Sequence, residues 1–176
     1  MPEFNQKILL IAGALIVGLM AAGWDLKCRK IPNWLTFPGI MAGIILNLLF
    51  NPRDWYFPFL GLIAGFLILI IPFVMGGIGA GDVKLLMALG AFLGAGAVIR
   101  IGLYGAVAGG LISLAALVKH RGFQYIKAKI YLIFTFRWSL KNRQQIQAES
   151  QRPKIFIPYG LAIFFGFLAS MFGMFN

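Results

Sequence analysis

The feature that most constrains this chain is the spacing of its charged residues. Six windows contain no Lys, Arg, Asp, Glu or His: 8–24, 34–50, 56–81, 85–99, 101–118 and 155–176. A helix that spans a bilayer needs about 20 mainly apolar residues, because lipid offers no partner to unpaired backbone groups. Each window therefore predicts one membrane-spanning helix, although the window 85–99 must extend into its flanks.

The composition of the chain supports the same fold class. Of its 176 residues, 60% are apolar and only 12% are charged, whereas soluble domains carry about 25% charged residues. The mean hydropathy is +0.86. Six spans use most of the chain, so we predict an all-α polytopic membrane protein, a six-helix transmembrane bundle in which residues 1–176 form a single transmembrane domain.

The basic residues predict the orientation of the bundle, since Lys and Arg gather in cytoplasmic loops. With the N-terminus outside, thirteen of the 16 Lys and Arg residues lie on the cytoplasmic side, and only Lys7, Arg53 and Arg100 lie outside. The net charge of +11 is then explained by topology and by contact with anionic lipid head groups. We predict no nucleic-acid partner.

The segment 119–154 differs from the rest of the chain. It contains nine of the basic residues and a single Glu, and its apolar run 130–136 is too short to cross a bilayer. Its aromatic and aliphatic residues recur mostly at steps of three and four, which favours a helix lying in the membrane interface. We predict a basic cytoplasmic or interfacial segment here.

Two of the five acidic residues stand at the ends of predicted spans. Asp25 closes the first span and Asp82 opens the fourth, whereas Glu3, Asp54 and Glu149 fall in terminal or loop sequence. In the predicted topology the first span ends inside and the fourth begins inside. Charge counting therefore brings Asp25 and Asp82 to one membrane face.

A carboxylate after a glycine-rich approach, as in GGIGAGD (76–82), has a chemical use. Glycine lets backbone segments pass closely, and the free N–H groups at a helix start favour an anion. If Asp25 packs against Asp82, the two carboxyl groups share one proton, the arrangement of an aspartic protease. The simpler alternatives are that Asp82 only caps its helix, worth about 1 kcal/mol, and that Asp25 is solvated.

Three segments resemble the type IV prepilin peptidases, which are GxGD aspartic membrane proteases. They are IPN (31–33) after Asp25, GAGDVKLL (79–86), and more weakly IPYG (157–160) at the last span. The resemblance implies a membrane-embedded endopeptidase of the prokaryotic inner (plasma) membrane. Such an enzyme removes the short basic leader of prepilin-like proteins, cutting after a glycine at the cytoplasmic face.

The resemblance also assigns roles to particular residues. Asp25 and Asp82 match the two catalytic aspartates. The matched supporting or substrate-binding positions are Gly79, Gly81, Lys84, Asn33 and Pro158. For Lys84 an ordinary interfacial lysine is the alternative. We expect no cofactor and no metal, because the two carboxyl groups activate water by themselves and Cys28 is the one cysteine.

Larger members of this family resemble a fusion of the peptidase with a segment that bears CxxC motifs and methylates the new N-terminus. The sequence lacks these motifs, and we expect no methyltransferase activity. The substrate is left open between pilins, including those of tight-adherence (Flp-type) pili, and archaellins.

Two alternatives from other classes remain. One is an ion- or proton-coupled transporter, although transporter sites usually lie near the midplane of internally repeated halves. The other is a non-enzymatic scaffold of a secretion machine, in which both acids are structural.

Overall fold

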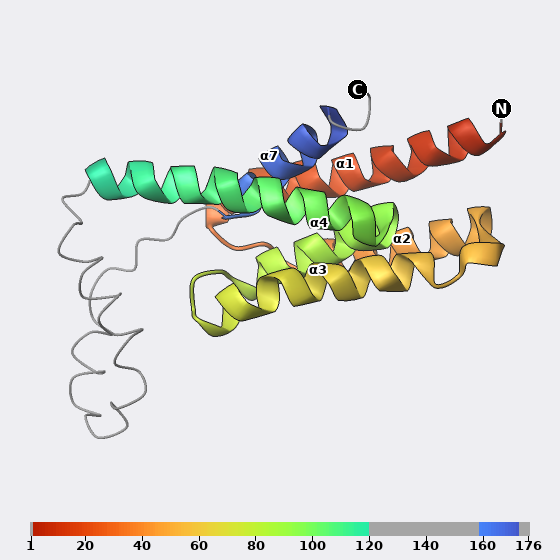
Figure 1. Cartoon of the computed structure of the whole chain (residues 1–176), viewed down its shortest axis with the longest axis horizontal. Coiled ribbons are helices and arrows are strands. Elements are labelled where there is room, and N and C mark those ends of the chain that lie inside the picture. Colours follow the sequence, from red (N-terminus) through yellow and green to blue (C-terminus); the bar gives the residue numbers. More distant parts are fainter. Residues whose placement is uncertain (1, 120–158, 173–176) are drawn as a thin grey trace, which may run out of the picture. The chain divides into compact units, whose positions relative to one another are not determined.

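The computed structural model describes residues 2–119 and 159–172. In chain order these residues form α1 (Pro2–Cys28), α2 (Asn33–Phe50), the 3-10 turn η1 (Pro52–Asp54), α3 (Phe57–Val74), α4 (Ala80–Lys119) and α7 (Tyr159–Phe172) (Figure 1). No strand occurs among them. The chain divides into two compact units, and the first, Met1–Gly110 with Pro158–Asn176, holds everything discussed below. The predicted interfacial segment 119–154 lies, beyond Lys119, outside the described residues.

Several of these helices suit a lipid bilayer. Within the described part of the chain, four stretches are long and apolar enough to cross a membrane: Phe4–Cys28, Asn33–Phe50, Phe57–Val74 and Ala80–Ile112; α7 is a shorter apolar helix. Large apolar side chains point outward, among them Leu49 at 69% exposure and Leu103 at 64%. The chain is therefore an integral membrane protein with several helical spans, as its composition predicts. The count of six spans and the outside N-terminus stay predictions.

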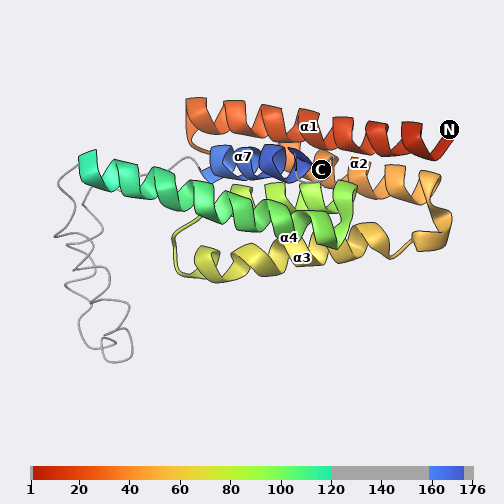
Figure 2. The ribbon, with the colours of Figure 1, turned by 45° about the horizontal axis from the view of Figure 1, so that its top comes forward.

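Helix α4 is broken at Gly94, where the backbone has φ 79° and ψ 175°. Figures 1 and 2 show the chain reversing there, so that the second arm runs back beside the first. A methyl group built on Gly102 in the second arm would lie 3.7 Å from Leu86 in the first. Glycine adopts this backbone conformation without the steric cost of a side chain, and the ring of Phe57 packs directly on it.

The position of this break differs from the sequence prediction. The apolar windows 85–99 and 101–118 placed the boundary at Arg100, but the chain turns six residues earlier. Arg100 is instead an exposed residue within the second arm. The window boundary was wrong because a helix can carry one outward-facing charge, whereas only the backbone conformation at Gly94 reverses the chain.

Asn47 of α2 donates hydrogen bonds to the carbonyl groups that lose their helical partners at the break. Its side-chain amide is 2% exposed and donates to the carbonyl oxygens of Ala91 at 2.9 Å and of Phe92 at 3.1 Å. The helical partners of these carbonyls would be the N–H groups four residues on, beyond the break at Gly94. Asn47 thus caps the first arm of α4 from a neighbouring helix.

Glycines set the distance between helices. A methyl group built on Gly61 of α3 would overlap the carbonyl of Gly90 in α4, and one on Gly90 would overlap the carbonyl of Gly61. A close approach of the same kind joins α7 to α4, where a methyl group built on Gly166 would lie 2.5 Å from the N atom of Gly105. The sequence placed these small residues four apart, which predicts close helix packing in lipid, and the contacts confirm it.

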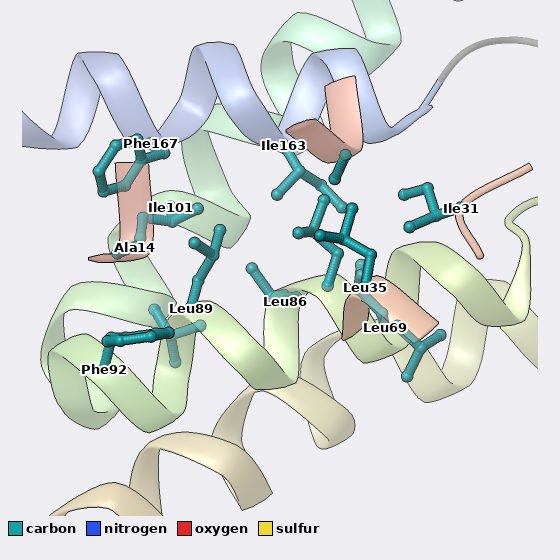
Figure 3. Close-up of a cluster of buried hydrophobic side chains, with 14 of the residues drawn as sticks. Ala14, Ile31, Leu35, Leu69, Leu86, Leu89, Phe92, Ile101, Ile163 and Phe167 are labelled. Carbon is teal, nitrogen blue, oxygen red and sulfur yellow. The ribbon is translucent and has the colours of Figure 1, made fainter. Parts of the chain in front are cut away.

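The first arm of α4 is the centre of the bundle. Its residues Leu85, Leu86, Ala88, Leu89 and Ala91 are all 0% exposed. A helix enclosed on every side is apolar all round, and the run VKLLMALGAFL fits this pattern apart from one lysine near its start. Figure 3 shows the buried side chains that join this arm to its neighbours. This packing fixes the position of the first arm of α4, whose first turn carries Asp82.

Candidate active site

Asp25 lies in the last turn of α1 and is 5% exposed. Its Oδ2 atom accepts a hydrogen bond of 2.9 Å from the N–H of Gly160, and the N–H of Leu161 also donates to this carboxyl group. Both N–H groups belong to the first turn of α7, where backbone donors have no partner within the helix. Asp25 therefore caps α7 from another helix, and the positive end of the α7 dipole faces its carboxylate.

Asp82 lies in the first turn of α4 and is 8% exposed. Its Oδ2 atom accepts a hydrogen bond of 3.0 Å from the N–H of Gly79, and its own N–H donates to the carbonyl of Gly79 at 3.1 Å. The Asp82 side chain thus makes one half of a capping box, in which the side chain of the third helical residue reaches back to the backbone N–H of the residue before the helix. The expectation that Asp82 opens the fourth span is confirmed.

The two carboxyl groups come together at one end of the bundle. Asp25 and Asp82 lie close enough to interact electrostatically, and Tyr159 at the start of α7 lies within the electrostatic range of Asp82. Each carboxyl group accepts hydrogen bonds from backbone N–H groups at the start of a helix. Two neighbouring carboxyl groups can act as a general base and a general acid on the same substrate.

Three glycines make the close approaches possible. A methyl group on Gly79 would lie 3.2 Å from Asp82 Oδ2, and one on Gly160 would lie 2.9 Å from Asp25 Oδ2. A methyl group on Gly81 would meet Ile31, 2.9 Å from its Cβ. The predicted residues Gly79 and Gly81 thus lie at the site, and Gly160 joins them from the opposite end of the chain.

The other two predicted supporting residues in the described chain lie beside each other. Lys84 donates a hydrogen bond of 2.8 Å from Nζ to Oδ1 of Asn33, and its ammonium group lies 4.8 Å from the centre of the Phe37 ring. This contact joins the start of α2 to the start of α4 on an exposed face. Pro158 lies outside the described residues.

The sequence singled out the segments of two further site residues without giving them a role. Ile31 lies between Gly81 and Gly160, and Tyr159 packs its ring on Gly109. The sequence instead predicted supporting roles for their neighbours Asn33 and Pro158, which match the family motif. The signal that would have found Ile31 is an aliphatic residue in a charged loop, after Arg29 and Lys30 and before a proline.

Metal binding has no obvious place in this part of the chain. Within residues 2–119 and 159–172, no three His, Cys, Asp or Glu side chains lie close enough together to hold a metal ion. The expectation that the protein needs no metal stays a prediction.

Known proteins are similar to this chain across the region that carries both acids. A family model described as the type IV leader peptidase family matches residues 10–114. Two curated relatives, both named prepilin leader peptidase/N-methyltransferase, come from Burkholderia pseudomallei strains 1026b and K96243 and are each 37% identical over 115 residues. These matches cover 61% of this chain but only 37% of the length of either relative. No solved structure matches the chain.

Proposed function

Because the chain belongs to the type IV leader peptidase family, we propose that it is a membrane-embedded aspartic endopeptidase with Asp25 and Asp82 as its catalytic pair. The observation that carries this proposal is that the two carboxyl groups meet, nearly buried, at one end of the bundle. They come from α1 and α4, and each is oriented by backbone N–H donors.

The chemistry follows from these positions. One carboxylate takes a proton from a water molecule, while the other, protonated, donates a hydrogen bond to the carbonyl oxygen of the peptide to be cut. The hydroxide attacks the carbonyl carbon, and the first carboxyl group then returns its proton to the leaving nitrogen. The helix starts at α4 and α7 hold both side chains in place, so little orientation is left to fix when the substrate binds.

The substrate proposed for this site is a prepilin-like protein, the class that the names of the relatives give. Its basic leader is cut after a glycine, and its apolar stem helix lies against the apolar outer face of the bundle. Archaellin-like proteins have the same build and are the alternative. Asn33, Lys84 and Pro158 are proposed as supporting residues around the cleavage site.

The proposed setting is the inner (plasma) membrane of a prokaryotic cell, with six spans, the N-terminus outside and the site at the cytoplasmic face. The break at Gly94 supports this count, because it divides α4 into two antiparallel arms. Together with α1, α2, α3 and α7 they amount to six helical segments. The basic loop Lys27–Lys30 beside Asp25 supports a cytoplasmic site and contact with anionic lipid.

Cleavage of a co-expressed prepilin-like substrate tests the proposal. Wild type, Asp25→Asn, Asp82→Asn and the control Asp54→Asn are compared, because Asp54 is an exposed carboxylate in η1, remote in sequence from both acids. We expect wild type and the control to cut after the leader glycine, as read from the mass of the product. Each active-site variant should lose activity by at least about 10²- to 10⁴-fold, the usual worth of a general acid or base.

Two results would count against the proposal. If Asp25→Asn or Asp82→Asn, present at wild-type level in the membrane, still cuts at the wild-type rate, that residue has a structural role and the two-aspartate mechanism is wrong. If no variant and no wild type cuts, the site serves another purpose, such as ion coupling or a scaffold.

A further inference from the structure

Ile31 is a buried side chain in the loop between α1 and α2. It is 8% exposed, although the loop around it carries Arg29 and Lys30, both exposed. The loop turns at Arg29, whose φ of 52° is left-handed and whose N–H closes the end of α1 on the carbonyl of Asp25 at 2.8 Å. Figure 3 shows Ile31 at one end of the cluster of buried side chains.

Ile31 lies against Gly81 of α4 and Gly160 of α7. A methyl group built on Gly81, the residue before Asp82, would lie 2.9 Å from Cβ of Ile31 and 3.0 Å from its carbonyl oxygen. A methyl group built on Gly160 would lie 2.9 Å from Cδ1 of Ile31 and equally 2.9 Å from Oδ2 of Asp25. The terminal methyl of Ile31 and the Asp25 carboxylate thus face the same small space.

This packing limits what can approach the two carboxyl groups. A peptide carbonyl that is attacked there must lie within hydrogen-bond reach of both side chains. The Cα atom bonded to that carbonyl, and any side chain it bears, must then enter the space beside them. Protein interiors are close-packed, so the volume that Ile31 occupies is not open to another methyl group.

We propose that Ile31 is a specificity-determining residue, which restricts the substrate residue that provides the attacked carbonyl to one without a side chain. This inference rests on the peptidase function proposed above and adds to it the contact that sets the substrate size. The observation behind this proposal is that the Cδ1 methyl of Ile31 and Oδ2 of Asp25 lie equally close, at 2.9 Å, to a methyl group built on Gly160.

Trimming Ile31 tests this with a ratio of rates. Ile31→Val removes the Cδ1 atom alone, and Ile31→Ala removes the rest of the side chain beyond Cβ. Each variant is given two co-expressed prepilin-like substrates that carry Gly or Ala before the cut. One methyl group in a tight pocket changes rates by about 10- to 200-fold, so wild type should prefer the Gly substrate by this factor. We expect both trimmed variants to reduce the preference about tenfold or more.

The matched control is Ile40→Ala. Ile40 lies on α2, is buried to the same 8%, and stands nine residues beyond Ile31, so its trimming loosens the bundle without opening the site. The Gly-to-Ala ratio does not depend on how much protein folds, and Ile31→Val changes the core by one methyl group only. The control should keep the wild-type ratio.

The outcomes separate the two proposals. If wild type cuts the Gly substrate but Ile31→Val and Ile31→Ala keep the wild-type ratio, the role of Ile31 is refuted and the peptidase function stands. An equal change of ratio in Ile40→Ala also refutes it, because general loosening would explain the effect. If wild type cuts neither substrate, the peptidase function fails and the inference about Ile31 falls with it.

Discussion

Replacing Asn47 by leucine should destabilise the bundle, because it removes a buried cap of α4. The Asn47 side-chain NH2 group lies 2.9 to 3.1 Å from three carbonyl oxygens, those of Gly43, Ala91 and Phe92, and its two N–H donors are shared among them. Leucine has nearly the same shape but donates nothing. The variant therefore removes the hydrogen bonds while it leaves the packing volume almost unchanged.

The size of the effect follows from the carbonyls that lose a donor. The Gly43 carbonyl lies within the continuous helix α2, so the loss of its hydrogen bond from Asn47 matters least. The carbonyls of Ala91 and Phe92 stand at the break of α4 and in apolar surroundings. Each buried polar group left unpaired costs about 1–3 kcal/mol, so two such carbonyls cost about 2–6 kcal/mol. Leucine also removes Asn47 Oδ1, which is buried without a hydrogen-bond partner among the described residues, so the net cost of Asn47→Leu should be about 1–3 kcal/mol. This is a large share of a total stability of about 5–15 kcal/mol.

Thermal unfolding of the detergent-solubilised protein measures this cost. For a chain of this size about 1 kcal/mol corresponds to about 2–4 °C in Tm, so the midpoint should fall on the order of 5 °C. Ser170→Ala is the matched control, because Ser170 is 0% exposed and its hydroxyl has no hydrogen-bond partner within the described residues. Removing an unpaired hydroxyl should leave the midpoint unchanged or raise it.

A wild-type midpoint in Asn47→Leu would refute the reasoning. It would mean that the carbonyls at the break are paired by some other group, so that the cap contributes nothing. A fall of equal size in Ser170→Ala would also contradict it, since any change in the buried bundle would then be destabilising whatever its hydrogen bonds.

Two further changes probe the site itself. Gly160→Ala places a methyl group 2.9 Å from Asp25 Oδ2, so the carboxylate must move and cleavage should fall by about 10²-fold. The control Gly96→Ala, where nothing lies within 4 Å of the added methyl group, should cut at the wild-type rate. Equal activity of the two variants would contradict this. Lys84→Met and Asn33→Ala should each lower the stability slightly, and the double variant should cost no more than the larger single one, with a coupling of about 0.5–1 kcal/mol in a thermal double-mutant cycle. Additive effects would show that the exposed bond at 2.8 Å contributes nothing.

Much of the architecture could be predicted from the sequence, because a bilayer requires each spanning segment to be apolar and helical by itself. Windows without charge are long enough to form helices that lipid accepts, and the glycines four residues apart predict where these helices meet. The same reading placed Asp25 at the end of one helix and Asp82 at the start of another, facing the same side. Helix starts and charge counts depend on neighbours in sequence, so no tertiary information was needed.

The contacts that hold the site could not be predicted in this way. The donor to Asp25 is the N–H of Gly160, 135 residues away, and the donor to Ala91 is Asn47, 44 residues away. The reversal at Gly94 was not predicted for the same reason, because its packing partner, Phe57, lies on another helix. The sequence marks Gly160 within the IPYG segment and Asn47 as a polar residue within an apolar window, but it does not say which groups they contact.

The sequence by itself determined that this chain spans a membrane and carries two acids at one end, because lipid selects for hydropathy and charge along the chain. Only the tertiary structure decided which backbone groups bind those acids and that Ile31 lies between Gly81 and Gly160. The physical reason is that a hydrogen bond or a close contact depends on distances of a few ångströms between helices, and these are fixed by packing rather than by the order of residues.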